Sequence, residues 1–105
     1  MASTTWNVIA DPQRRAMLEL LRDRPRSVNE LTEELGLSQP GTSKHLRVLR
    51  EAELVTVRAD AQRRVYALSP APLAELDDWL APYRRFWDAR LDALGRHLND
   101  TDPKE

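Results

Sequence analysis

Apolar side chains recur at helical spacing between Asp11 and Arg24. They are Ala16, Met17, Leu20 and Leu21, with arginines on the other side of the predicted helix. Asp11-Pro12 marks where this helix begins, because Asp is a favourable N-cap and Pro fits the first helical position. The helix is expected to end before Arg24-Pro25, since the residue preceding a proline is pushed out of helical geometry.

Two further helices are predicted over residues 27–35 and 38–51, joined by a tight turn that contains Gly36. Ser27 followed three residues later by Glu30 forms a capping box, and Gly36 can supply the left-handed residue that ends a helix. Ser38 caps the second helix. Helical spacing predicts these buried positions: Val28, Leu31, Leu35, Thr42, Leu46 and Leu49.

A β-hairpin is predicted over residues 54–68. Leu54–Arg58 and Arg63–Leu68 are rich in β-branched and aromatic residues, and the polar link Ala59–Gln62 has the length of a turn. The link contains no glycine, so the pattern leaves the strand pairing open. A helix pair followed at once by a hairpin indicates a mainly α fold with a small β-hairpin, a winged helix-turn-helix.

A long apolar stripe runs through residues 70–98. Its members are Leu73, Leu76, Leu80, Tyr83, Trp87, Leu91, Leu94 and Leu98, widened by Trp79 and Phe86. Pro82 either kinks one long helix or begins a second one. Residues 1–11 hold a smaller apolar cluster (Trp6, Val8 and Ile9) that needs a partner surface, and residues 99–105 form a polar tail.

Length and composition indicate a single globular domain. The chain has 105 residues, of which 41% are hydrophobic and 31% charged, and we expect one domain over residues 1–98. No apolar run reaches membrane-spanning length and residues 1–10 lack a signal-peptide pattern, which predicts a cytoplasmic protein with no membrane partner. The absence of cysteine excludes disulfides and thiolate metal sites.

The net charge of −1 conceals an uneven distribution. Residues 36–68 carry six basic and three acidic side chains, a net +3, whereas residues 69–105 carry five basic and eight acidic side chains, a net −3. This pattern favours a compact protein with one basic face, as expected of a nucleic-acid binder.

The polar face of residues 38–51 carries the groups that recognise DNA. Glutamine can pair with adenine, arginine or lysine with guanine, and serine with a base or a phosphate. The tight turn makes the two helices cross steeply, so the second one protrudes. Arg58, Arg63 and Arg64 cluster around the hairpin tip, where they can contact the DNA backbone. Double-stranded DNA is therefore the predicted partner.

The segment Glu30–Val55 resembles the helix-turn-helix of the ArsR-type (ArsR/SmtB) bacterial transcription regulators. The run Ser-Gln-x-x-x-Ser-x-His-Leu from Ser38, followed by Leu-x-x-Ala-x-Leu-Val, carries the resemblance, which extends from about Trp6 to Leu98. It implies a homodimer that represses transcription at a two-fold symmetric operator. It also implies base or phosphate contacts by Gln39, Ser43 and His45, and backbone contacts by Ser38, Lys44 and Arg47.

Three departures from the family pattern matter. The family's metal sensors use cysteines in the first helix of the motif, or Asp, His and Glu sets on the C-terminal helix. In this chain the first helix of the motif reads Glu30-Leu-Thr-Glu-Glu-Leu, without cysteine, and only His97 lies near the metal-site positions of the C-terminal helix. The chain therefore resembles the metal-free members, and no metal or cofactor is expected. Glu53 stands where the family often has Gly, and Gly41 where Ala is common.

The apolar residues of the two terminal segments are predicted to form a dimer interface by meeting across a two-fold axis. They are Trp6, Ile9, Trp79, Tyr83, Phe86, Trp87 and Leu91. Core packing or a small-molecule pocket are alternative explanations of the aromatic stripe, and no effector ligand is indicated. The position of His45 beside a core leucine by itself favours a packed side chain, whereas the family resemblance favours a DNA contact.

The alternative function is a winged-helix module that binds protein rather than DNA, which the nearly neutral net charge allows. An enzyme is not expected. The sequence has no nucleophile with a base at plausible spacing, no phosphate-binding glycine loop and no metal-ligand set.

Overall fold

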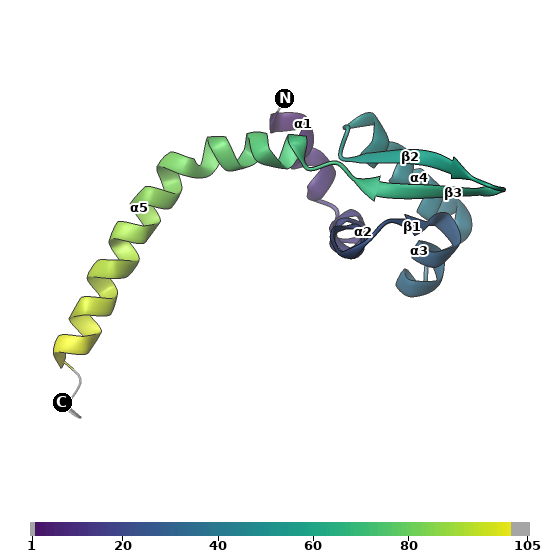
Figure 1. Ribbon diagram of the computed structural model, residues 1–105. Coiled ribbons are helices and arrows are strands. Elements are labelled where there is room, and N and C mark those ends of the chain that lie inside the picture. The colour runs from purple at the N-terminus through teal and green to yellow at the C-terminus, as the bar shows by residue number, and fades with distance from the viewer. Residues whose placement is uncertain (1, 102–105) are drawn as a thin grey trace.

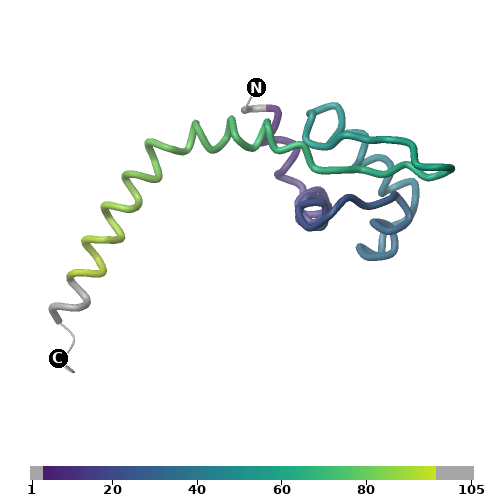
Figure 2. The backbone as a smooth tube through the Cα atoms, viewed as in Figure 1, coloured from purple at the N-terminus to yellow at the C-terminus, as the bar shows by residue number. Residues whose placement is uncertain are grey.

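The computed structural model describes the backbone of residues 2–101 and the side chains of residues 4–96 (Figures 1 and 2). A body of short helices and a small sheet carries one long projecting helix. In chain order the elements are α1 (Ala2–Ile9), α2 (Pro12–Asp23), β1 (Arg26–Ser27), α3 (Val28–Leu35), α4 (Gln39–Glu51), β2 (Val55–Asp60), β3 (Arg63–Leu68) and α5 (Ala71–Thr101).

The helix boundaries expected from capping residues are confirmed. The Asp11 carboxylate accepts hydrogen bonds from the amides of Gln13 and Arg14 at the start of α2. At the start of α3, Ser27 and Glu30 form both bonds of the capping box. Gly36 ends α3 with a positive φ of 66°, which glycine adopts without steric cost.

The sheet has three antiparallel strands in the order β1-β3-β2. The predicted hairpin is present, and its second strand has the predicted bounds. The first strand continues to Asp60 instead of ending at Arg58, so the connection shortens to Ala61 and Gln62 between the paired residues Asp60 and Arg63. The third strand, β1, was not predicted, because two residues are too short for a periodicity to appear. It pairs Arg26 with Tyr66, which joins the helix pair to the wing.

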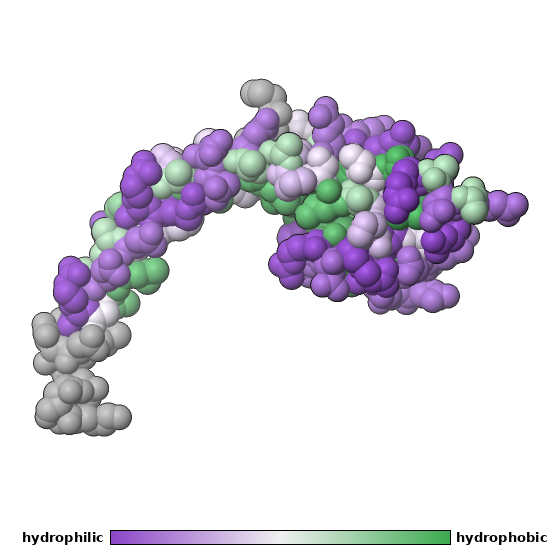
Figure 3. Space-filling model, viewed as in Figure 1, coloured by the Kyte–Doolittle hydropathy of each residue, from purple (hydrophilic) through white to green (hydrophobic). Residues whose placement is uncertain are grey.

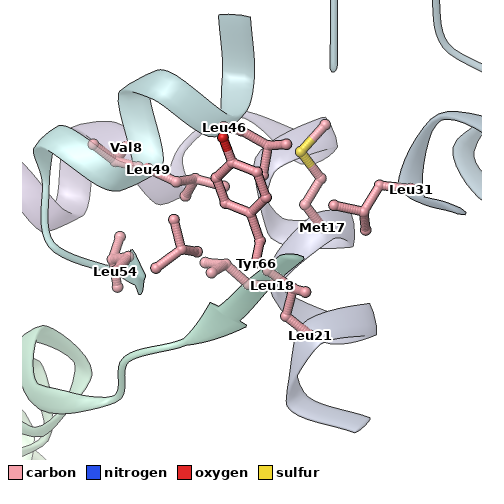
Figure 4. Close-up of a cluster of buried hydrophobic side chains, with 10 residues drawn as sticks. Val8, Met17, Leu18, Leu21, Leu31, Leu46, Leu49, Leu54 and Tyr66 are labelled. Carbon is pink, nitrogen blue, oxygen red and sulfur yellow. The ribbon is translucent and has the colours of Figure 1, made fainter. Parts of the chain in front are cut away.

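The core lies between α2, α3, α4 and the sheet (Figure 4). Met17, Leu31, Leu46 and Leu49 have no exposed surface, and the ring of Tyr66 packs among these helical side chains. Since Leu46 and Leu49 anchor one side of α4 in this core, the opposite side of the helix must face outward.

The N-terminal segment is helical, which the sequence pattern did not predict. Within α1, Val8 is buried and Ile9 packs against the core. Trp6 packs edge-on against Trp79 of α5 in the same chain, with ring centroids 5.8 Å apart. The two terminal segments thus already touch within one chain, and their predicted meeting across a two-fold axis stays a prediction.

Helix α5 runs unbroken through Pro82, so the proline does not start a second helix. The helix changes direction along its length and projects from the body (Figures 1 and 2). A proline inside a helix removes one backbone hydrogen bond and is a common cause of such bending. The helix continues to Thr101, into the predicted polar tail, and the side chains of His97 and Leu98 lie outside those described.

Candidate nucleic-acid interface

A groove of about 700 Å³ lies between the helix pair α3–α4 and the wing formed by β2 and β3. Its lining comes from the start of α3, the outer side of α4 and the tip of the hairpin. The lining residues are Ser27, Val28, Asn29, Gln39, Pro40, Ser43, Lys44, Arg47, Arg50, Gln62, Arg63, Arg64 and Tyr66. The groove therefore unites segments that are distant in sequence.

Helical periodicity decides which side chains of α4 reach the groove. Thr42, Leu46 and Leu49 are buried, whereas Ser43 and Arg47 are exposed on the outer side. The position of the helix is fixed against α3, because the hydroxyls of Thr32 and Thr42 lie 2.9 Å apart. The groove-facing side chains of α4 thus come from a helix that packs against α3.

The groove is strongly cationic although the chain as a whole is not. Lys44, Arg47, Arg50, Arg63 and Arg64 line it, and its lining residues include no carboxylate. Clustered lysine and arginine side chains attract the phosphates of a nucleic acid, because neutralising phosphates releases condensed counterions. A glutamine, an asparagine and serines in the same lining provide neutral donors and acceptors for base edges.

A buried arginine links α3 to α2 beside the groove. Arg26 of β1 donates to the carbonyl of Leu20 at 3.1 Å and pairs with Glu34 of α3 at 2.6 Å. One guanidinium therefore links the end of α2 to the far end of α3. This pairing compensates the charge of a side chain that is only 6% exposed.

The comparisons with known proteins agree with this arrangement. Residues 11–57, from the N-cap of α2 into β2, match the family model described as "Bacterial regulatory protein, arsR family". The HTH-type transcriptional regulator Rv2034 of Mycobacterium tuberculosis is 44% identical over 94 residues, covering 90% of this chain and 85% of that protein. This chain belongs to the ArsR family.

Further relatives of this ArsR-family protein cover most of its length. The transcriptional repressor SdpR of Bacillus subtilis is 28% identical over 78 residues, covering 74% of this chain and 87% of SdpR. The crystal structure of a "possible transcriptional regulator for arsenical resistance" is 41% identical, with a TM-score of 0.66 over 87% of this chain and 92% of that one. The ArsR-family chain is thus a DNA-binding transcriptional regulator with a winged helix-turn-helix fold.

Most of the predicted DNA contacts of this ArsR-family protein meet in the groove. Gln39, Ser43, Lys44, Arg47, Arg63 and Arg64 all line it. Ser38 does not; its hydroxyl accepts a hydrogen bond from the amide of Gly41 at 3.1 Å and caps α4. Arg58, on β2, is exposed but lies outside the lining. DNA contacts by these residues stay predictions.

His45 lies apart from the groove and is only partly exposed. Its Nδ1 accepts a hydrogen bond of 3.4 Å from Arg14 of α2. Nearby, partial burial would raise the pKa of Asp11, but the amide hydrogen bonds from Gln13 and Arg14, with the charge of Arg14, hold that pKa below its usual 3.8. The contacts of His45 are thus with α2, and its predicted role at a base is untested.

Seven lining residues were not among the predicted contacts: Ser27, Val28, Asn29, Pro40, Arg50, Gln62 and Tyr66. Arg50 repeats the helical spacing of Ser43 and Arg47, a signal that could have found it. Asn29 belongs to the neighbouring helix, and only the packing of α3 against α4 brings it to Gln39. The sequence pattern of either helix alone therefore could not predict that Asn29 lies beside Gln39.

Two negative findings concern the described part of the chain. Among its side chains, no three His, Cys, Asp or Glu residues gather as they would around a metal ion. Over the same part, no helix is both long and apolar enough to span a membrane.

Proposed function

We propose that this protein represses transcription as a homodimer that binds a two-fold symmetric operator, with α4 in the major groove of each half-site. The observation that supports this proposal most strongly is the groove, where five cationic side chains surround Gln39 and Ser43. Repression is also the activity in the name of its relative SdpR.

The proposed roles divide by chemistry. Gln39 and Ser43, in the first turns of α4, contact base edges, because the N-terminal residues of a recognition helix reach deepest into the major groove. Lys44 and Arg47 contact phosphates on the flanks of that groove. Arg63 and Arg64, at the tip of the wing, contact the backbone or the adjacent minor groove.

The proposed dimer rests on the exposed apolar side of α5. Trp79, Tyr83, Phe86, Trp87, Leu91 and Leu94, here called the α5 stripe, are each 47–63% exposed. Green apolar atoms lie along the projecting helix in Figure 3. Exposed apolar patches of this kind mark interaction sites. The occupant we propose is a second copy, because one continuous stripe on a long helix can pack against its own symmetry mate.

Binding to DNA from the promoter of the protein's own gene tests the proposal. We expect a footprint over an inverted repeat and an affinity that falls steeply with added salt. Replacing Gln39 and Ser43 by alanine should weaken the preference for the repeat over unrelated DNA. Replacing Arg63 and Arg64 by alanine should weaken binding to all sequences alike.

The outcome of this experiment separates the two candidate functions. If both double variants bind the promoter as the unchanged protein does, α4 and the wing are not the DNA-binding elements. If the unchanged protein shifts no DNA at low salt, the protein-binding module becomes the better explanation of the groove.

A further inference from the structure

Gln39, the side chain proposed to contact a base, is already hydrogen-bonded in the free protein. Its Nε2 donates to Oδ1 of Asn29 at 3.3 Å, and both side chains line the groove. We propose that Asn29 is a positioning residue that orients the amide of Gln39 for recognition of adenine. This inference rests on the proposed function of Gln39 and adds a second residue, on a different helix, to sequence recognition.

The bond to Asn29 leaves Gln39 with the groups that adenine requires. A glutamine amide has two N–H donors and one carbonyl acceptor. One N–H binds Asn29, so one N–H and Oε1 stay available to the DNA. Adenine presents an acceptor at N7 and a donor at N6 in the major groove, which is the complementary pair.

The same bond selects one orientation of the amide. Because the amide is planar, a contact between Nε2 and Asn29 directs Oε1 of Gln39 away from α3. With the Asn29 amide oriented as in the structure, a flipped Gln39 amide would bring two carbonyl oxygens together, which are both acceptors and repel each other. Gln39 therefore meets the DNA with its donor on the side of α3 and its acceptor on the other side.

Asn29 can position Gln39 because the helix that carries its exposed side chain is held in place. It is the second residue of α3 and lies between the two partners of the Ser27–Glu30 capping box. The contact between Thr32 and Thr42 holds α3 against α4. A glutamine that is oriented before binding loses less rotamer freedom on binding than a free one, and this favours the correct complex.

A double-mutant cycle on DNA tests this role. Sites are first selected from random duplexes with the unchanged protein. The affinities of N29A, Q39A and the double variant are then measured by fluorescence anisotropy, for the selected site and for sites altered at single base pairs. Q39A should lower the preference at one A·T pair about tenfold, and N29A about threefold at the same pair. The double variant should lose no more than Q39A, because Asn29 acts through Gln39.

Two controls keep the result specific. Asn29→Asp retains an acceptor for Gln39, so the preference at the A·T pair should persist while affinity for all sites falls, since a carboxylate now faces the phosphates. Glu33→Ala changes an exposed residue of α3 outside the groove and should alter neither quantity. Circular dichroism confirms that each variant is folded.

The outcomes distinguish this inference from the proposed function. If N29A weakens binding to all sites equally and leaves the preference unchanged, Asn29 contacts phosphate and the positioning role is overturned, while the role of Gln39 stands. If Q39A leaves every base preference unchanged, Gln39 contacts no base and both fail. If the affected pair is not A·T, the assignment to adenine is overturned.

Discussion

Glu53, directly after the recognition helix α4, has a left-handed backbone with a φ of 62°. The amide of Leu54 donates to the carbonyl of Leu49 at 2.9 Å, and the amide of Glu53 to that of Arg50 at 3.0 Å. These two bonds form a Schellman motif, which usually has glycine at the left-handed position. The C-terminus of α4 therefore has the backbone conformation that glycine usually adopts there, although this chain has glutamate at that position.

We expect Glu53→Gly to raise the free energy of unfolding by about 1 kcal/mol, because it relieves the crowding of Cβ in the left-handed conformation. Thermal denaturation should show a melting temperature higher by about 4–8 °C. Glu51→Gly is the matched control. It places the same residue inside α4, where glycine lowers helix stability. Equal effects of the two variants would contradict this explanation.

Glu30 makes the stability of α3 sensitive to acid. The hydrogen bond from the backbone amide of Ser27 lowers the pKa of Glu30 below its usual 4.5; partial desolvation opposes this effect, and the Arg24 guanidinium adds to it. A carboxyl whose pKa is lower in the folded state stabilises the protein above the pKa of the unfolded state. That stabilisation disappears as the pH falls through the lower, folded value.

We therefore expect Glu30→Gln to reduce the dependence of stability on pH below 4.5, compared with the unchanged protein. Urea denaturation at a series of pH values between neutrality and acid measures this difference. At neutral pH the variant should be the less stable of the two, and the two curves should converge as the pH falls. Parallel curves would show that other carboxyls dominate acid unfolding.

At the scale of elements, the sequence predicts those that have their own periodicity and caps. Helices α2, α3 and α4 begin after Asp11, Ser27 and Ser38 as expected. Helix α1 lacks such a pattern. Its short apolar cluster packs partly against α5, which is distant in the sequence. Strand β1 forms by pairing with β3, a partner distant in the sequence. The sequence allows Pro82 either to kink one helix or to begin a second one, and in the structure α5 continues through it.

The same distinction applies to the site. The sequence predicts the outer face of α4 and the wing-tip arginines, because spacing within one element determines both. It does not predict Asn29 beside Gln39 or place His45 against Arg14, because packing between two helices creates these contacts.

Arg14 joins three helices through one side chain. It donates to the carbonyl of Val8 at the end of α1 at 3.1 Å and to His45 of α4 at 3.4 Å. Arg14→Met should keep much of the packing while removing these bonds, and we expect a loss of about 1–2 kcal/mol in the free energy of unfolding.

His45→Ala separates packing from recognition. Because the ring of His45 contacts α2 and not the groove, we expect reduced stability, measured by urea denaturation, with unchanged base preference, measured on single-base variants of the selected site. Arg14→Met should reproduce this pattern. A changed base preference in His45→Ala alone would instead support the base contact that the family resemblance implies.

At the scale of the whole molecule, the elongated shape follows from α5. The molecule measures 63 × 32 × 20 Å, and the cation–π contact between Arg90 and Phe86 lies on the projecting helix rather than in the core. The aromatic contacts between Trp6, Trp79 and Tyr83 cover the start of the α5 stripe only partly.

We expect Leu91→Glu to convert a dimer into a monomer, because it places a charge within the α5 stripe, where desolvation in the interface would be costly. Light scattering coupled to gel filtration at micromolar concentration measures the mass. Ala89→Glu adds the same charge outside the stripe, on another side of the helix, and should leave the dimer intact. If the unchanged protein is itself monomeric, the proposed dimer is wrong.

The groove and the α5 stripe share no residue: the first draws on positions 27–66 and the second on positions 79–94. After a gene duplication, substitutions in the groove could therefore give one copy a new operator while both copies still recognise each other. Mixed dimers with two different half-site preferences would result until the α5 stripe also diverged. In a genome with several such regulators, we therefore expect partner choice and operator choice to evolve under separate selection.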